Sequence, residues 1–363
     1  MKEKNKKVVC AMSGGVDSSL SAAILKKKGF EVIGIFMKLT DLDGQKKGEK
    51  RARKVAKILK IHFLVLDLRK EFKKRIVNYF LSELKKGLTP NPCVVCNKEI
   101  KFGLLMEKAL HLGANFIATG HYVRIRSLTN KKSITNKRIN KFLNLQSIRY
   151  SLMTAKYKKK DQSYFLWKLK QHQLKRLIFP IGKYTKKKVR QMTKEMKLPV
   201  FNTSESQEIC FIPKEINSFL KIHLKNKKGK IIDIKGKVLG EHEGLVFYTI
   251  GQRKGIKLSG GPFYVLDKNL KKNRIVVTKN EKDLLKKEIF VKDVNWVTGK
   301  ELKLPLKAQV KIRYRNKAMS AVIKKISNTK YQILFSKHQR AVTPGQSAVF
   351  YKKEELLGGG III

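Results

Sequence analysis

The chain has 363 residues, of which 42% are hydrophobic, enough for two or three domains with sizeable cores. It holds no run of eighteen apolar residues of the kind that a membrane-spanning helix needs. The basic start, residues 1–7, leads into a polar glycine loop, which does not fit a signal peptide. We therefore expect a cytoplasmic protein with no membrane contact.

The net charge is strongly positive, +56 from 83 Lys and Arg against 27 Asp and Glu. Such a charge attracts polyanions, which favours nucleic-acid binding. Only 15 of the 83 basic residues are Arg, however, and Arg is the side chain best suited to phosphate recognition. Abundant Lys, Ile and Asn are also typical of an AT-rich genome. The charge alone leaves nucleic-acid binding and compositional bias both open.

The first predicted unit is a strand, a glycine loop and a helix. Val8 to Cys10 predict a buried strand, Ser13 to Gly15 a tight loop, and Leu20 to Leu25 a helix that ends near Gly29. Glycine backbone N–H groups and the helix dipole together favour a phosphate. No Gly-Lys-Ser/Thr follows, so the loop is not a Walker A loop.

The loop sequence S-G-G-V-D-S-S, residues 13–19, resembles the PP-loop of ATP pyrophosphatases. That resemblance implies cleavage of ATP to AMP and pyrophosphate in order to activate an oxygen atom. The alternative is an ordinary strand–helix turn that contains glycines. Asp17 is a candidate for contact with Mg²⁺ or its waters, or it caps the helix N-terminus.

Strands and helices alternate after this unit. Strands are predicted at 31–37, 63–66 and 116–119, a polar loop at 38–49, and helices at 50–59, 67–86 and 100–112. This alternation predicts a parallel α/β sheet. Ligands of such sheets bind at the carboxyl ends of the strands, where Gly14, Met37 and Gly120 fall.

The second half of the chain has a different pattern, in which short predicted strands replace the alternation of strands and helices. We expect a hairpin with a long tip within 127–160 and a helical or extended segment at 189–196. Short strands follow at 230–234, 247–250, 263–266 and 274–278, and a further set runs from 288 to 350. Closely spaced short strands with Gly and Asn turns are typical of small β domains or barrels. The predicted boundaries are an α/β domain at 1–204, a central β-rich domain at 205–282 and a β-barrel at 283–363.

Four cysteines are too few for a disulfide-stapled fold of this size. Cys10, in the first predicted strand, is expected in the core. Cys93 and Cys96 form a C-x-x-C pair, which invites a zinc or dithiol interpretation, but no second ligand pair is present. Cys210, in S-Q-E-I-C-F-I, is a third candidate. Thiols that meet across a site can pass sulfur and close as a disulfide.

An ordered set of motifs resembles the bacterial tRNA-specific 2-thiouridylases over nearly the whole chain. The motifs are A-M-S-G-G-V-D-S-S at 11–19, F-M-K at 36–38, T-P-N-P-C-V-V-C-N-K-E-I-K-F at 89–102, A-T-G-H-Y-V-R at 118–124, K-D-Q-S-Y-F-L at 160–166, S-Q-E-I-C-F-I at 206–212, G-E-H-E-G-L-V-F-Y-T-I-G-Q-R-K-G at 240–255, R-Y-R at 313–315, A-V-T-P-G-Q-S-A-V-F-Y at 341–351 and the terminal L-G-G-G-I. The resemblance implies an N-terminal PP-loop domain of the adenine nucleotide alpha hydrolase type, a small central domain and a C-terminal β-barrel.

The resemblance also implies roles for individual residues. Cys96 matches the nucleophile and Cys210 the persulfide carrier, and the two would form a transient disulfide. ATP would be held by Ala11, Met12, Ser13, Gly14, Gly15, Val16, Asp17, Ser18, Met37 and Gly120. The target base would meet Asn91, Pro92 and Cys93. The tRNA contacts would be His121, Lys160, Asp161, Gln162, Arg313, Tyr314 and Gln346. Some family members have Asp at the position of Cys93, so general acid–base catalysis stays unassigned.

The implied reaction is ATP-dependent 2-thiolation of the wobble uridine of tRNA, with Mg²⁺ beside the ATP phosphates. The expected partners are tRNAs for lysine, glutamate and glutamine, and a persulfide donor such as a cysteine desulfurase or a sulfur-relay protein. Direct attack by the persulfide and attack by released hydrosulfide are both open. Rival interpretations are an amidotransferase-linked synthetase, a 4-thiouridine synthase and a catalytically silent RNA-binding protein. No glutaminase domain is evident in this chain, which argues against the amidotransferase-linked synthetase. Cys210 does not lie in a C-terminal rhodanese-like domain, which argues against the 4-thiouridine synthase.

Overall fold

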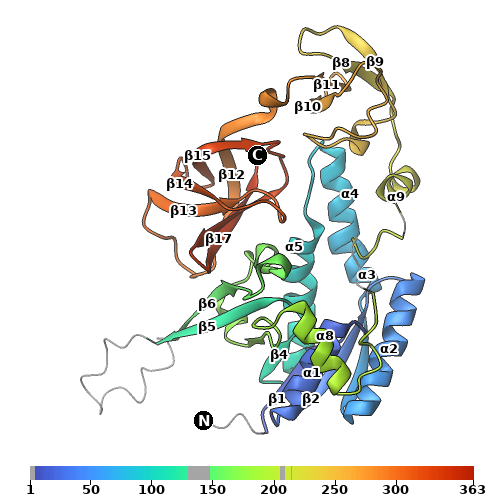
Figure 1. Cartoon of the computed structure of the whole chain (residues 1–363), viewed down its shortest axis with the longest axis vertical. Helices are drawn as coiled ribbons and strands as arrows, with labels where there is room; N and C mark the ends of the chain where they lie inside the picture. Colours follow the sequence, from blue (N-terminus) through green and yellow to red (C-terminus); the bar gives the residue numbers. More distant parts are fainter. Residues whose placement is uncertain (1–4, 130–147, 205–208, 214) are drawn as a thin grey trace.

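The computed structural model describes residues 5–129, 148–204, 209–213 and 215–363. Three sheets form three parts (Figure 1), with the N-terminal α/β part at the bottom of the view, a small sheet at the top and a barrel on the left. The predicted fold class is confirmed. The tip of the predicted hairpin within 127–160 lies outside the described residues.

The N-terminal sheet is parallel, in the order β3-β2-β1-β4-β7. Its strands are β1 (Lys7–Ala11), β2 (Glu31–Lys38), β3 (His62–Asp67), β4 (Phe116–Ala118) and β7 (Leu177–Ile178). Cys10 pairs with Gly34 on one side and Ala118 on the other, and it is fully buried, as predicted. The carboxyl ends of β1, β2 and β4 therefore lie next to one another.

Helices cover both faces of this sheet. Alternate residues of β1 divide between two cores: Val8 and Cys10 pack with α1 (Val16–Lys27) and α2 (Asp43–Leu59), and Val9 and Ala11 pack with the helices after residue 92. The remaining helices are α3 (Arg69–Phe72), a π-helix (Lys73–Val77), α4 (Asn78–Lys85), α5 (Pro92–Cys96), a second π-helix (Asn97–Leu104), α6 (Leu105–His111), α7 (Gln171–Leu174), α8 (Lys186–Glu195) and α9 (Ile216–His223).

The loop predicted at 38–49 is wrong in its second half, because α2 already begins at Asp43. The reason is a tertiary contact. A Cβ on Gly14 would lie 2.0 Å from the Gly48 oxygen, so the early part of α2 packs backbone to backbone on the glycine loop. Arg51 Nε, on the same helix, donates to the Gly14 oxygen at 2.9 Å. Sequence periodicity cannot register contacts of this kind.

The central sheet has the order β10-β11-β8-β9. Its strands are β8 (Gly229–Ile232), β9 (Val238–His242), β10 (Tyr264–Asn269) and β11 (Arg274–Thr278). The strand predicted at 247–250 is wrong, because a 3₁₀ turn at Leu245–Phe247 follows Gly244, whose φ is +150°. Tyr248 still packs in this small core.

The C-terminal barrel closes through pairing of β12 with β17. Its strands are β12 (Leu285–Trp296), β13 (Leu306–Lys311), β14 (Met319–Lys325), β15 (Lys330–Arg340), β16 (Ser347–Lys352) and β17 (Glu355–Ile362). The hairpin of β5 (Val123–Thr129) and β6 (Ile148–Thr154) extends the same sheet through the pairing of β6 with β17.

Trp167 seals the contact between the N-terminal part and the barrel. It is fully buried, and its Nε1 donates to Ser347 Oγ at 3.0 Å. A Cβ on Gly359 would lie 2.8 Å from the Trp167 ring, so the glycines of the terminal L-G-G-G-I motif make room for this indole. Trp167 thus shares one core with Val9 and Ala11 of β1 and with Val349 of the barrel, which joins the two parts.

Candidate active site

The glycine loop follows β1 at the carboxyl edge of the sheet. Ser18 Oγ accepts from the Ser13 N–H at 3.1 Å and donates to the Gly15 oxygen at 3.2 Å, which folds the loop back onto the start of α1. Gly14 has φ +75°, a conformation that glycine adopts without strain. The helix α1 is N-capped by Gly15 with no side-chain cap, so its first N–H groups are available to an anion.

Asp17 does not cap the helix. Lys186 Nζ, from the start of α8, lies 2.7 Å and 2.8 Å from its two carboxylate oxygens, and Tyr122 Oη donates to Oδ1 at 2.7 Å. The Lys186 side chain is 13% exposed and that of Asp17 is 31% exposed, so this ion pair is partly shielded from water. Sequence reasoning missed both partners, because their contacts join distant segments.

Gly120 and Met37 lie where the sheet topology predicts. A Cβ on Gly120 would be 2.8 Å from the Ser18 nitrogen, so β4 delivers Gly120 directly against the N-terminus of α1. Met37 is half-buried at the end of β2. Ala11 and Met12, at the end of β1, are buried. The predicted ATP residues are thus brought to one edge of the sheet.

The second group of candidates is a cluster of three free thiols. Cys93 and Cys96 lie on the one-turn helix α5, and Cys210 arrives from a segment far along the chain. The three are close enough for a charge on one to affect the pKa of another. Cys96 and Phe211 belong to the same apolar core, which explains how the Cys210 segment is held there. Cys93 and Cys210 have exposed surface, whereas Cys96 is buried.

All three thiols are disfavoured as thiolates. Removal from water raises the pKa of Cys96 to about 12 and that of Cys210 to about 11, and it raises the pKa of Cys93 as well. In each case the positive charge of Lys101 acts in the opposite direction and lowers the pKa.

Lys101 is a residue of the site to which the sequence assigned no role. It lies on the π-helix Asn97–Leu104, whose hydrogen bonds span five residues and so bring a residue five positions after Cys96 round to a nearby face. No ion pair or hydrogen bond holds its amino group among the residues that the structure describes. Its charge is therefore available to the thiols. The only sequence signal for this role was that Lys101 follows Cys96 by five residues. That spacing brings the two side chains near each other only on a π-helix.

Asn97, next to Cys96, is buried. Its Nδ2 donates to the Phe165 oxygen at 3.2 Å, but its Oδ1 has no hydrogen-bond partner in the described part of the chain. A buried, unpartnered acceptor is costly, so this oxygen is a candidate to accept a hydrogen bond from a group bound beside Cys96.

His121 and Asp161, predicted to contact tRNA, are both buried and have protein partners. His121 Nδ1 lies 2.7 Å from Thr119 Oγ1, and burial together with the Lys101 charge holds its pKa well below the usual range. Asp161 accepts from the Ala155 N–H at 2.8 Å and from Ser163 Oγ at 2.7 Å. Direct contact of these side chains with RNA stays a prediction, because the structure shows both of them buried and engaged in hydrogen bonds within the protein.

The loop predicted to meet the target base is held against the barrel. Gln346 Nε2 donates to the Thr89 oxygen at 2.8 Å, and the Thr89 N–H donates to the Pro344 oxygen at 2.9 Å. Asn91 then forms the N-cap of α5, with Pro92 at its first position. Gln346 thus has a protein partner that fixes the segment carrying Asn91 and Cys93.

The other predicted tRNA residues also have partners within the protein. Arg313 Nη2 donates to the Ile250 oxygen at 3.1 Å and to the Ala341 oxygen at 2.8 Å, which joins the central part to the barrel. The ring of Tyr314 packs on Phe165, with 4.5 Å between centroids. Gln162 accepts from the Tyr122 N–H at 2.9 Å, and Lys160 ends a 3₁₀ turn and is half-buried.

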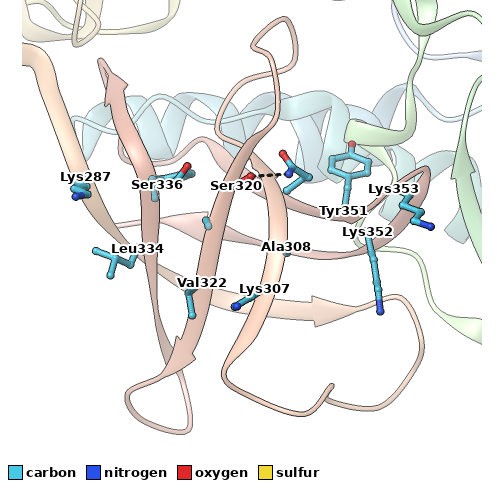
Figure 2. A pocket seen from close by; sticks show the side chains of 13 residues that line it. Lys287, Lys307, Ala308, Ser320, Val322, Leu334, Ser336, Tyr351, Lys352 and Lys353 are labelled. Atoms are coloured by element: carbon cyan, nitrogen blue, oxygen red, sulfur yellow. Dashed lines mark hydrogen bonds between the residues drawn. The ribbon is translucent and has the colours of Figure 1, made fainter.

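A depression of about 580 Å³ lies on the barrel surface and contains none of the predicted ATP or thiol residues. Figure 2 shows Lys307, Val322 and Leu334 projecting from neighbouring strands, with Lys287 at one side and Lys352 and Lys353 at the other. Four lysines and no acidic side chain line it. We call these four, Lys287, Lys307, Lys352 and Lys353, the barrel lysines.

The zinc interpretation of the C-x-x-C pair finds no support. Among the described residues there is no group of three or more His, Cys, Asp or Glu that could hold a metal ion.

Within the same residues, no helix combines the length and the apolar character needed to cross a bilayer.

A phosphate-type glycine loop in an α/β domain, a cluster of free thiols and two further β domains are together the features of an ATP-dependent sulfur-handling enzyme. Three family models match in order: a tRNA methyl transferase HUP domain at residues 6–214, a tRNA methyl transferase PRC-barrel domain at 217–279 and an aminomethyltransferase beta-barrel domain at 286–362.

Two known proteins match this chain over nearly its whole length. A tRNA-specific 2-thiouridylase MnmA 2 of Thermoanaerobacter sp. (strain X514) is 44% identical over 99% of this chain and 98% of its own. A tRNA-specific 2-thiouridylase MnmA of Syntrophomonas wolfei is 43% identical over 98% and 99%. The chain therefore belongs to the tRNA-specific 2-thiouridylase family. A solved U34-tRNA thiolase NcsA from Methanococcus maripaludis shares 20% identity over 61% of this chain and 68% of its own, with a TM-score of 0.36, too weak a likeness to carry an argument.

Proposed function

We propose that the protein is a tRNA-uridine 2-sulfurtransferase, which uses ATP to replace the 2-carbonyl oxygen of the wobble uridine with sulfur. The observation that carries this proposal is that Cys96 and Cys210, far apart in the sequence, lie within electrostatic reach of each other in a chain that also has a phosphate-type glycine loop before α1. Membership of the 2-thiouridylase family supports the same conclusion. The family models carry the words methyl transferase, but a cluster of free thiols favours sulfur transfer.

The first step is adenylylation. The uridine O2 attacks the α-phosphorus of ATP, the bond to the β-phosphate oxygen breaks, and pyrophosphate leaves. The N–H groups of Gly14, Gly15 and the first turn of α1 stabilise the phosphate charge as it shifts. The uridine carbon 2 then carries an AMP leaving group in place of a poor one.

The second step is sulfur transfer. The terminal sulfur of a Cys210 persulfide attacks carbon 2 and AMP leaves, after which the Cys96 thiolate attacks the Cys210 sulfur and breaks the S–S bond. The uridine keeps the sulfur in reduced form, and the two thiols end as a Cys96–Cys210 disulfide. Alternatively, Cys96 first releases hydrosulfide, which attacks carbon 2. Both routes balance, because two thiol electrons reduce one sulfane sulfur.

We include Mg²⁺ in the proposal as an ion that would bind together with the ATP phosphates. The Asp17 carboxylate is already neutralised by Lys186, so the described residues offer no ready protein cage for the ion. Where Mg²⁺ binds, it would offset the charge of the ATP phosphates. The loop N–H groups would do the same, and Lys186 would act only by cancelling the Asp17 charge.

The partners follow from this chemistry. Substrate tRNAs for lysine, glutamate and glutamine, and a cysteine desulfurase or sulfur-relay donor, are proposed from family membership. The target base must leave its stack to reach thiols at this depth. A cytoplasmic location is proposed with them.

The test combines nucleotide and base analysis. Purified protein, unmodified tRNA, ATP and a persulfide donor should yield 2-thiouridine at the wobble position, with AMP and pyrophosphate in equal amounts. Formation of ADP and phosphate, or of a methylated base without thiolation, would reject the proposal.

A further inference from the structure

An apolar groove lies beside the second candidate cysteine. It measures about 400 Å³ and runs between α9 and the segment that precedes α2. Its lining residues are Leu42, Phe211, Pro213, Glu215, Ser218, Phe219, Ile222 and His223. Figure 1 shows α9 to the right of α4, with the barrel on the left. The groove is therefore separate from the barrel lysines.

The groove is open and apolar in a chain that is otherwise dominated by lysine. Ile222 is 80% exposed, the largest value among the exposed large hydrophobic residues of the described part of the chain, and Ile216 on the same helix is 44% exposed. The lining contains no Lys or Arg, although the chain has 83 of them. A surface without cations does not suit RNA phosphates, whereas exposed aliphatic side chains suit another protein.

Its position connects it to sulfur delivery. Phe211 lines the groove, and Cys210 immediately precedes it. Cys210 has exposed surface, whereas Cys96 is only 6% exposed. Of these two cysteines, Cys210 is thus the one that presents surface to a carrier.

The groove is also mechanically linked to the Cys210 segment. The Phe211 ring packs edge to face against Phe72, Phe80 and Phe219, with centroids 5.6–5.7 Å apart. Phe219 lies on α9, and the other two lie on the helical segment from α3 to α4. A protein seated on α9 would thus rest on the residues that fix Cys210.

We propose that this groove is the docking site of the protein that delivers sulfane sulfur to Cys210, a proposal that rests on the proposed function. Lys225, Lys227 and Lys228 are exposed and follow α9 in the chain, whereas Glu215 is the acidic residue of the lining. The matching partner surface therefore has an apolar centre, with acidic residues toward these lysines and none opposite Glu215. In the step itself, the Cys210 thiolate attacks the outer sulfur of the donor persulfide. The donor S–S bond breaks, the donor cysteine leaves as a thiolate, and Cys210 carries the persulfide, with no net redox change.

The experiment compares two donors on two variants. Ile222→Lys places a charge in the groove at a position exposed enough to leave the fold intact, and Ile326→Lys, at an isoleucine 54% exposed in the barrel part, is the matched control. The donors are a cysteine desulfurase loaded with persulfide from cysteine, and glutathione persulfide. The readout is the rate of persulfide formation on Cys210, followed by mass spectrometry.

With the desulfurase, Ile222→Lys should lower the second-order rate constant about tenfold, as expected when a residue at the centre of an interface no longer fits its partner. With glutathione persulfide, wild type and both variants should react equally. Three outcomes overturn the docking proposal: equal rates with the protein donor, a decrease with both donors, or a wild type that takes sulfur no faster from the desulfurase than from glutathione persulfide. Dissociation of a wild-type dimer, or weaker tRNA binding, on Ile222→Lys would assign the groove to another occupant.

Failure of the proposed function is distinguishable from failure of the docking site. If wild type loaded by glutathione persulfide makes no 2-thiouridine from tRNA and ATP, the function itself is wrong. If it does, and only the Ile222→Lys result fails, the docking site alone is wrong.

Discussion

Lys186 Nζ lies 2.7 Å and 2.8 Å from the two carboxylate oxygens of Asp17, in the first turn of the helix that follows the glycine loop. The pair joins α8 to the first turn of α1, where the phosphate charge would develop. An unpaired Asp17 would repel a triphosphate, and Lys186 removes that repulsion. We therefore expect Lys186 to act in the nucleotide site as well as in the packing of the two helices.

Lys186→Met should weaken ATP binding about tenfold, since the bare Asp17 charge then faces the phosphates. Equilibrium dialysis with ATP measures the effect, and Lys187→Met, at the exposed neighbouring residue, is the control. The double variant Asp17→Asn/Lys186→Met should recover part of the affinity, because it removes both charges. Equal affinities for Lys186→Met and Lys187→Met would contradict this role.

A second prediction concerns thiol reactivity and pH. A group with a raised pKa stays protonated over a wider pH range, so Cys210, at about 11 against an ordinary 9.0, should be alkylated about 100-fold more slowly than a free thiol at pH 8. Its rate should rise up to about pH 11, and that of Cys96 up to about pH 12. Iodoacetamide labelling across pH, read by peptide mass spectrometry, gives both profiles.

Lys101→Met should move these profiles to still higher pH, because the positive charge that it removes favours the thiolates. Lys98→Met, at an exposed lysine of the same π-helix, is the matched control and should leave them unchanged. Unchanged profiles in Lys101→Met would mean that the amino group lies too far from the thiols to act on them.

How much the sequence could predict depended on the range of each contact. The strand–loop–helix unit at Val8 to Leu25 was readable because its signals lie within a few residues of one another. The start of α2 was missed because it rests on the Gly14–Gly48 approach, and the strand at 247–250 was wrong because Gly244 starts a turn. The Asp17–Lys186 pair and the joining of β6 to β17 are long-range contacts that no local pattern contains.

Arg313→Ala should weaken binding of cognate tRNA about tenfold while leaving ATP affinity nearly intact. Arg313 joins the Ile250 and Ala341 carbonyls, so its removal loosens the junction of the central part and the barrel as well as deleting a cation. Filter binding with the tRNA substrate measures the effect, and Arg315→Ala, at an exposed residue in the same loop, is the control. Normal tRNA binding by Arg313→Ala would show that the predicted contact is wrong.

The barrel lysines should contribute to RNA affinity in a salt-dependent way. Replacing Lys287, Lys307, Lys352 and Lys353 by Gln should flatten the slope of log K against log salt by about 0.9 for each RNA phosphate that the variant no longer neutralises. The control replaces Lys26, Lys27, Lys28 and Lys57, four exposed lysines of α1, its C-cap and α2. Equal slopes for the two quadruple variants would mean that the depression in Figure 2 is not part of the RNA surface.

The last prediction separates the three thiols, which the structure places within electrostatic reach of one another. Cys96→Ser and Cys210→Ser should each abolish 2-thiouridine formation, because one removes the resolving thiol and the other the sulfur carrier. Adenylate formation should survive in both, since it depends on the loop. Cys93→Ser should retain substantial thiolation, because Cys93 is a neighbour that carries no sulfur.

Peptide mapping after one turnover without reductant should then show a Cys96–Cys210 cross-link in the wild type. Cys93 has exposed surface and lies one helical turn from Cys96, so a local cross-link is a real competitor. A Cys93–Cys96 disulfide together with an inactive Cys93→Ser would make the C-x-x-C pair the redox centre. In that case Cys210 would serve only to receive sulfur, and the resolving step would belong to α5 alone.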